Sequence, residues 1–194
     1  MLNALQKFLL ACVIGTLTFS PWEILMTRTD LVGYANPDFM GIPWWAVAAY
    51  GIGSAVAVFL WVGWDRMMRT RVDYPGGGLA LEYLLLAAIY SLILFFRTSP
   101  YLLVLGLSLI ILLRLIFFHQ PWDLSSFLIG ACVGPTLELI LAAFHLYFFT
   151  EPDFLGMPYW LPLLMGNIAI ALRRLSWVLV PPPPVTTPQP SVLR

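Results

Sequence analysis

The sequence Glu-Pro-Asp-Phe-Leu-Gly-Met-Pro-Tyr-Trp occupies positions 151–160, and a related one, Asn-Pro-Asp-Phe-Met-Gly-Ile-Pro-Trp-Trp, occupies positions 36–45. A constant shift of 115 positions carries the earlier copy onto the later one without a gap. The same shift carries Gly51 onto Gly166, Glu23 onto Glu138 and Asp30 onto His145. Self-similarity at a fixed offset is the signature of a repeated structural unit. We therefore expect two copies of one helical hairpin, at about residues 5–64 and 120–179.

The composition places both hairpins in a membrane. Of 194 residues, 60% are hydrophobic and only 10% are charged, whereas a soluble domain is about 45–50% apolar and about 25% charged. The net charge is zero, which argues against a nucleic-acid partner because such a partner requires a basic face. Cys12 and Cys132 stand alone in apolar segments. This pattern predicts neither a disulfide framework nor a structural zinc, and we expect no metal and no cofactor.

A membrane span requires roughly 20 apolar residues, and six segments approach this length. They are residues 5–26, 43–64, 79–96, 101–118, 124–149 and 158–179. The loops between them are short, so neighbouring helices should be antiparallel. The first segment lacks a clear cleavage site, so we interpret it as a retained span and not as a signal peptide. The sequence predicts an all-α, six-transmembrane-helix bundle over residues 1–180 and an extended or disordered Pro-rich tail over residues 181–194.

The distribution of basic residues predicts the orientation of the chain. Six spans place both termini on one face, and that face receives Lys7, Arg66, Arg69, Arg71, Arg173, Arg174 and Arg194, with Arg114 close by. The other face receives Arg28 and Arg97. The positive-inside rule then makes both termini cytoplasmic, in a bacterial plasma membrane or the endoplasmic reticulum. Both repeated hairpins start on the same face, so they are parallel repeats related by a pseudo-twofold along the membrane normal. We expect Glu82 and Arg114 to extend from their spans toward the headgroups.

Each copy of the repeated stretch has the composition of a tight turn at the membrane interface. The residues shared by the two copies are Pro37, Asp38 and Phe39 in the first and Pro152, Asp153 and Phe154 in the second. Proline restricts the residue before it to extended geometry, and aspartate accepts backbone N–H bonds in turns. A structural turn and a functional loop contact are both compatible with this pattern.

Glu23 and Glu138 lie within apolar helices, each 15 residues before Asp38 or Asp153. A carboxylate at membrane depth costs roughly 2.5–3.5 kcal/mol, so it should face protein or a wet cavity. Seven residues cover nearly two helical turns, so we expect Glu138 and His145 to share a face. Three interpretations stay open for these groups. They could form a structural network, anchor the hydroxyl or headgroup of a bound lipid, or act as general acids on an isoprenoid.

The residues after the second hairpin's first helix resemble a known family. Tyr147–Leu155, then Trp160-Leu161-Pro162, then Gly166-Asn167-Ile168 and Arg173 resemble the end of the INSIG (insulin-induced gene) family. That family has Pro-Asp-Phe-Leu, Trp-Leu-Pro and Gly-Asn-Ile before an arginine and a cytosolic C-terminus. The resemblance implies a six-helix bundle with a lipid-accessible central pocket. Eukaryotic members bind oxysterols and retain membrane-protein partners, and bacterial relatives hold diacylglycerol-like lipids.

These observations favour a membrane protein that binds a sterol, isoprenoid or diacylglycerol as a sensor or regulator. The residues expected to line its pocket are Glu23, Trp44, Trp45, Gly51, Glu138, His145, Tyr159 and Trp160. An alternative is a small membrane enzyme of isoprenoid or carotenoid metabolism, with Glu23, Glu138 and His145 as its catalytic groups. A third is an assembly subunit with no ligand. The sequence assigns neither a partner protein nor an oligomeric state.

Overall fold

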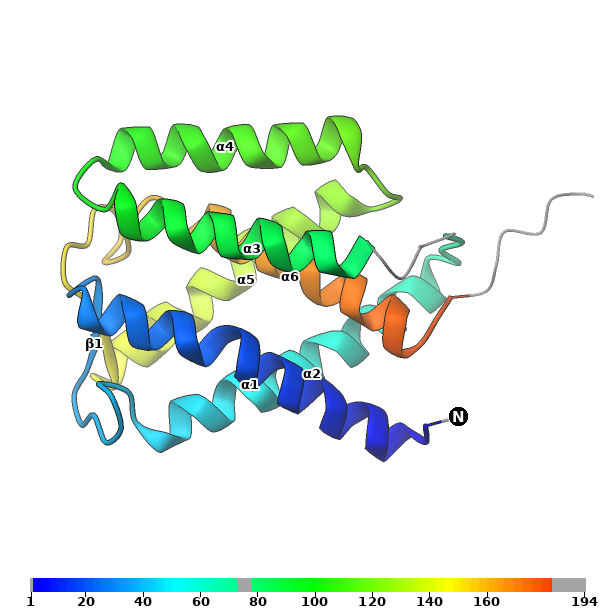
Figure 1. Cartoon of the computed structure of the whole chain (residues 1–194), viewed down its shortest axis with the longest axis horizontal. Helices are drawn as coiled ribbons and strands as arrows, with labels where there is room; N and C mark the ends of the chain where they lie inside the picture. The colour runs from blue at the N-terminus through cyan, green and yellow to red at the C-terminus, as the bar shows by residue number, and fades with distance from the viewer. Residues whose placement is uncertain (1, 73–77, 183–194) are drawn as a thin grey trace, which may run out of the picture.

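The computed structural model describes residues 2–72 and 78–182, and within these ranges it contains six helices and one pair of strands (Figure 1). In chain order the elements are α1 (Ala4–Arg28), β1 (Val32–Tyr34), α2 (Trp44–Met67), α3 (Gly78–Phe95), α4 (Pro100–Phe117), α5 (Asp123–Ala143), β2 (Tyr147–Phe149) and α6 (Leu161–Leu179). The start of α1 and the end of α6 lie at the same end of the bundle. Most of the predicted Pro-rich tail, residues 183–194, lies outside the described residues.

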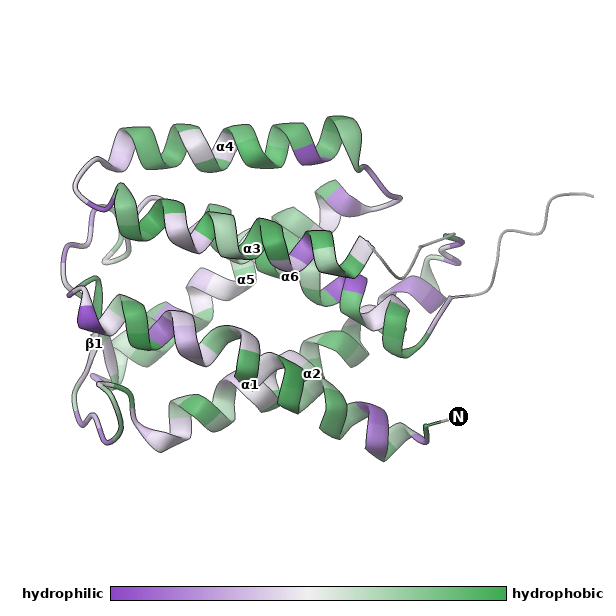
Figure 2. Ribbon diagram, viewed as in Figure 1, coloured by the Kyte–Doolittle hydropathy of each residue, from purple (hydrophilic) through white to green (hydrophobic). Residues whose placement is uncertain are grey.

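Five helices, α1 to α5, are long and apolar enough to cross a membrane, and hydrophobic residues cover most of their surface (Figure 2). The sixth, α6, is the central helix. Of its 19 residues, 13 are buried, and it packs against α2, α3, α4 and α5. Because neighbouring helices separate α6 from lipid, it carries polar and charged residues that a lipid-facing helix excludes. The prediction of a multi-pass helical membrane protein is confirmed.

The prediction of an all-α fold needs one correction, because two short strands join the hairpins. β1 and β2 pair antiparallel, with Val32 opposite Phe149, Gly33 opposite Phe148 and Tyr34 opposite Tyr147. The prediction that the fifth span reaches residue 149 is wrong, because α5 ends at Ala143 and the residues of β2 lie beyond it. Aromatic residues favour strands, and pairing satisfies backbone groups that would otherwise be exposed near lipid. The strands therefore connect the two loops at the end of the bundle opposite the start of α1 and the end of α6.

Helices α1 and α5 end in the same way. The residue after each C-cap, Asp30 or His145, adopts a left-handed conformation with φ of 57° and 56°. The next N–H bonds back into the helix, from Leu31 to the Met26 carbonyl at 3.0 Å and from Leu146 to the Leu141 carbonyl at 3.1 Å. Such a closure ends a helix and redirects the chain. His145 therefore lies beyond α5 and does not share a helical face with Glu138.

Glycines allow the two helices of each hairpin to approach each other closely. A Cβ on Gly51 of α2 would lie 3.0 Å from the carbonyl oxygen of Cys12 in α1. A Cβ on Gly166 of α6 would lie 2.9 Å from the carbonyl oxygen of Phe127 in α5. Small residues at helix contacts are typical of membrane proteins, because they let two backbones come close enough for favourable van der Waals contact. The helix pairs α1–α2 and α5–α6 are accordingly the most closely packed parts of the bundle.

Candidate functional site

A cavity of about 240 Å³ lies between the two hairpins. Its lining comes from α1, α2, α3, α5, β2 and α6 and is mostly apolar. The residues are Phe19, Glu23, Met26, Ala49, Tyr50, Gly53, Ser54, Tyr90, Gly134, Leu137, Glu138, Tyr147, Trp160, Leu161, Leu164, Met165, Ile168 and Leu172. An apolar cavity with a few placed polar groups is typical of a small-molecule site.

A hydrogen-bonded chain fixes one of the two glutamates in this cavity. The Tyr34 hydroxyl donates to Glu23 Oε1 at 2.9 Å, and the Tyr34 and Tyr50 hydroxyl oxygens are 3.0 Å apart. The two hydroxyl groups thus form one hydrogen-bonded cluster with the Glu23 carboxyl group. Tyr50, at the end of this chain, is also a lining residue of the cavity. The chain therefore orients Glu23 and offers a polar contact to a ligand.

A larger apolar groove of about 560 Å³ adjoins this cavity. It lies between α2, α5 and α6, and its lining includes Leu60, Trp64, Val133 and Ala169. Five residues line both spaces, namely Gly134, Leu137, Met165, Ile168 and Leu172. Leu60 and Val133 expose 68% and 52% of their surface, so the groove opens at the outer surface of the bundle. The cavity, with its few polar groups, thus continues into an apolar groove that opens at the outer surface of the bundle.

The structure brings together three of the eight predicted pocket residues. Glu23, Glu138 and Trp160 line the cavity. Gly51 contacts α1 instead, and His145 is exposed beyond the end of α5. The remaining three are exposed aromatic residues outside both lining sets, namely Trp44, Trp45 and Tyr159.

The predicted turn motif forms in both hairpins with the same geometry. Asp38 Oδ2 accepts the Trp44 N–H at 3.2 Å, and Asp153 Oδ2 accepts the Tyr159 N–H at 3.2 Å. Phe39 stacks on Trp44 with ring centroids 5.3 Å apart, and in the second copy Phe154 stacks on Tyr159 at 6.4 Å. These contacts account for the shared Asp and aromatic residues as parts of a turn.

The tyrosines of the cavity were not predicted from the sequence. Tyr50, Tyr90 and Tyr147 line the cavity. Tyr34 is not a lining residue, but its hydroxyl donates a hydrogen bond to Glu23, which is one. Each lies in or beside an otherwise apolar span, and a hydroxyl in such a position needs a partner. The need of each tyrosine hydroxyl for a hydrogen-bond partner is the sequence signal that could have linked these tyrosines to the buried glutamates.

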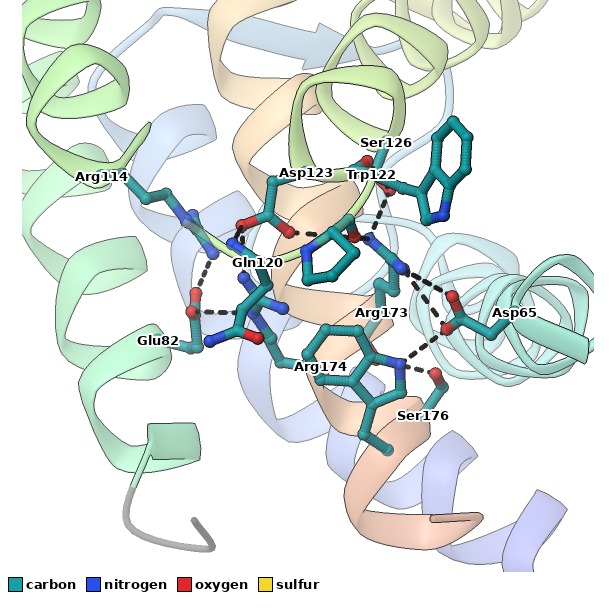
Figure 3. A network of polar contacts seen from close by, with 12 residues as sticks. Asp65, Glu82, Arg114, Gln120, Trp122, Asp123, Ser126, Arg173, Arg174 and Ser176 are labelled. Atoms are coloured by element: carbon teal, nitrogen blue, oxygen red, sulfur yellow. Dashed lines mark hydrogen bonds and ion pairs between the residues drawn. The ribbon is translucent and has the colours of Figure 1, made fainter. Parts of the chain in front are cut away.

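A second polar group, which we call the ion network, lies between the helices on the side of the bundle where α2 ends and α5 begins (Figure 3). It contains three acidic and three basic side chains, namely Asp65, Glu82, Asp123, Arg114, Arg173 and Arg174. These side chains come from α2, α3, α4, α5 and α6. All six are at most 5% exposed. Their formal charges balance, as buried charges must.

Arg173 is at the centre of the network. Its Nη2 lies 2.6 Å from Asp65 Oδ1, and its Nη1 donates to the Pro121 carbonyl at 2.7 Å and lies 3.6 Å from Asp123 Oδ1. Trp177 Nε1 donates to the other Asp65 oxygen at 2.6 Å. One guanidinium group therefore connects α6 with α2 and with the start of α5.

The other two arginines extend the network to α3 and α4. Arg174 bonds to Asp123, and its Nε lies 3.5 Å from Glu82 Oε1. Arg114 bonds to Glu82 and donates to Asn167 Oδ1 at 3.1 Å. The expectation that Glu82 and Arg114 extend to the headgroups is wrong. A charged partner inside the bundle was available to each, and pairing there avoids leaving a charge in lipid.

Comparison with solved structures gives a likeness over nearly the whole chain. The crystal structure of MvINS, a mycobacterial Insig homologue from Mycobacterium vanbaalenii, superposes with a TM-score of 0.78 at 12% identity, covering 95% of this chain and 99% of that one. A cross-linked trimer of a cysteine variant of MvINS superposes with a TM-score of 0.77 at the same identity and coverage. No protein-family model and no curated protein matches the sequence. The predicted resemblance is thus confirmed at the level of the fold, and the chain has the fold of a bacterial Insig homologue.

Proposed function

We propose that the chain is a membrane-embedded lipid-binding protein that acts as a sensor or regulator. Its ligand is an uncharged amphiphile with a hydroxyl head, such as a sterol, an isoprenoid alcohol or a diacylglycerol. The observation that carries the proposal is the continuity between the cavity with Glu23 and Tyr50 and the apolar groove between α2 and α5. The head would lie in the cavity and the hydrocarbon part in the groove.

The polar groups of the cavity favour a hydroxyl head over a phosphate. Neither lining set contains a lysine or arginine among the described residues. A phosphate would therefore meet the carboxyl groups of Glu23 and Glu138 without a cation to offset its charge. A hydroxyl group donates and accepts, which suits the Tyr50 oxygen and the two carboxyl groups. The cavity therefore accommodates an uncharged head group at a lower free-energy cost than a phosphate.

We propose further that the two hairpins are parallel repeats. In the strand pair, Gly33 lies opposite Phe148, and these are equivalent positions under the 115-residue shift. A twofold axis between two antiparallel strands places the residue nearest the axis opposite its own equivalent in the other strand. The closures at Asp30 and His145 and the turns at Asp38 and Asp153 repeat at the same offset. The cavity would then lie at the repeat interface, as in other repeated membrane proteins.

The orientation is also a proposal, with both termini in the cytoplasm. The ion network removes Arg114, Arg173 and Arg174 from the count of free charges because they are buried and paired. The exposed residues Arg66, Arg69 and Arg71 still outnumber Arg28 and Arg97 at the opposite end. The positive-inside rule then gives the same orientation as before.

Replacing Gly53 with tryptophan tests the lipid site directly. Gly53 lines the cavity, and a Cβ there meets no atom within 4 Å, so a larger side chain starts in open space and takes up ligand space. We expect co-purified lipid to fall by about tenfold or more. Lipid extracted from equal amounts of gently purified protein and quantified by mass spectrometry measures the effect.

The matched control is Leu105→Trp, which adds an indole to a side chain of α4 that is 66% exposed. It should retain the lipid content of the wild-type protein. Equal lipid in Gly53→Trp, Leu105→Trp and the wild type would contradict the proposal. Unchanged thermal unfolding of Gly53→Trp would show that any loss of lipid comes from the filled cavity and not from misfolding.

A further inference from the structure

A second cavity, of about 320 Å³, lies where the end of α2 meets the end of α6 and is distinct from the lipid site. Its lining combines α2, the segment after it and the end of α6. The residues are Val62, Asp65, Arg66, Arg69, Thr70, Arg71, Trp177, Val180, Pro181 and Pro182. None of them lines the cavity or the groove described above. We call this space the arginine pocket.

Among the described residues, the lining of the arginine pocket carries an excess of positive charge. Arg66, Arg69 and Arg71 are exposed, and no ion pair joins them to an acidic residue in the described part of the chain. Asp65 does not offset them, because its carboxylate accepts bonds from Arg173 at 2.6 Å and from Trp177 at 2.6 Å. Among the described residues, three arginines therefore line one space and none of them is paired with an acidic side chain, which favours an anion there.

A buried hydroxyl in the same lining adds an independent observation. Thr70 is 3% exposed, and its Oγ1 has no hydrogen-bond partner among the described residues. A buried polar atom without a partner costs free energy unless a water or ligand satisfies it. Thr70 is also a lining residue of the arginine pocket, so we assign its hydroxyl a ligand oxygen as partner in the proposal below.

The end of α2 fixes these side chains. The Thr70 N–H bonds to the Asp65 carbonyl at 2.9 Å, and the Arg69 N–H bonds to the Arg66 carbonyl at 3.2 Å. Arg69 has φ of 51°, a left-handed conformation that glycine adopts most easily at this position of a helix end. The turn places Arg69, Thr70 and Arg71 consecutively on the pocket wall. Its geometry is held by the same Asp65 that binds α6.

We propose that the arginine pocket binds a phosphate group, presented by an anionic lipid headgroup or by a free phosphate compound. Arginine binds phosphate through paired, charge-assisted N–H bonds, and a threonine hydroxyl donates to the remaining oxygens. Basic clusters at the end of a membrane helix recognise anionic headgroups in this way. The bound phosphate would lie beside Asp65 and Trp177, next to the ion network that holds α6 in place.

Binding of dioctanoyl phosphatidic acid to the full chain in detergent tests the proposal. Wild-type protein should bind it saturably, as measured by microscale thermophoresis, and more tightly than dioctanoyl phosphatidylcholine. Arg69→Gln with Arg71→Gln should weaken this binding by about tenfold or more, and Thr70→Val by about threefold or more. Arg28→Gln with Arg97→Gln is the matched control, with the same charge change at the opposite end of the bundle, and should bind as the wild type does.

Competition with inorganic phosphate separates the two sources of the ligand. Displacement of the lipid by inorganic phosphate at millimolar concentration would show that the phosphate group alone is recognised. Failure to displace it, with the arginine dependence intact, would assign the site to a lipid headgroup. Equal binding by the Arg69→Gln/Arg71→Gln variant and the wild type would overturn the proposal. Gly53→Trp should bind phosphatidic acid as the wild type does. The test of the arginine pocket therefore gives the same answer whether or not the cavity between the hairpins binds a lipid.

Discussion

Replacing Arg173 with methionine is expected to lower the free energy of unfolding by about 3–5 kcal/mol. The side chain is fully buried and binds Asp65 and the Pro121 carbonyl. Methionine retains much of the arginine's length but cannot donate a hydrogen bond or balance a charge. Asp65 would remain buried with Trp177 as its remaining donor, and an uncompensated buried carboxylate is costly. Thermal and denaturant unfolding in detergent, followed by tryptophan fluorescence, measure the change.

Arg28→Met is the matched control for this prediction. Arg28 is exposed at the end of α1, and exposed charges contribute within about 0.5 kcal/mol. A second variant, Asp65→Asn with Arg173→Met, removes both charges of the pair and should be less destabilised than the sum of the two single changes. If Arg173→Met is as stable as Arg28→Met, the ion network does not hold the helices together.

Replacing Gly130 with alanine is expected to cost about 2–3 kcal/mol through overpacking. A Cβ at this position would lie 2.3 Å from Ala169 Cβ and 2.7 Å from the Met165 carbonyl oxygen. The second contact is with backbone, so relief requires α5 and α6 to move apart. This helix pair also forms one wall of the groove. Unfolding in detergent should show the loss of stability.

Gly53→Ala serves as the control because its added Cβ meets open space. It should be neutral or stabilising by up to about 1 kcal/mol, since alanine favours a helix more than glycine does. The comparison separates close packing from a general effect of removing a helical glycine. Equal stability of Gly130→Ala and Gly53→Ala would show that α5 and α6 do not approach as closely as described.

The membrane class, the six helices and the turns at Asp38 and Asp153 could be predicted from the sequence. Apolar segments of about 20 residues are specific to membranes, and a repeated stretch identifies equivalent turns. The end of α5 could not be predicted, because the residues from Phe144 to Phe149 are as apolar as the helix before them. The left-handed conformation of His145 ends the helix, and histidine carries no strong signal for it.

The candidate site was predicted only in part. Glu23 and Glu138 stood out because a carboxyl group in an apolar helix is costly. Tyr34 could not be connected with Glu23 from the sequence, because the strand pairing that positions it joins residues far apart in the chain. The ion network was missed for the same reason. Asp65 and Arg173 are 108 positions apart, and their separate positions near helix ends were compatible with free interfacial charges.

The lipid content of the wild-type protein tests the central claim most directly. Gently purified protein should be examined by native mass spectrometry, and its lipid should then be extracted and identified. We predict one uncharged, hydroxyl-bearing lipid in a near-stoichiometric amount, because the cavity holds hydroxyl partners and no cation among its described lining residues. Bulk phospholipid alone, without an adduct of defined mass, would contradict the account.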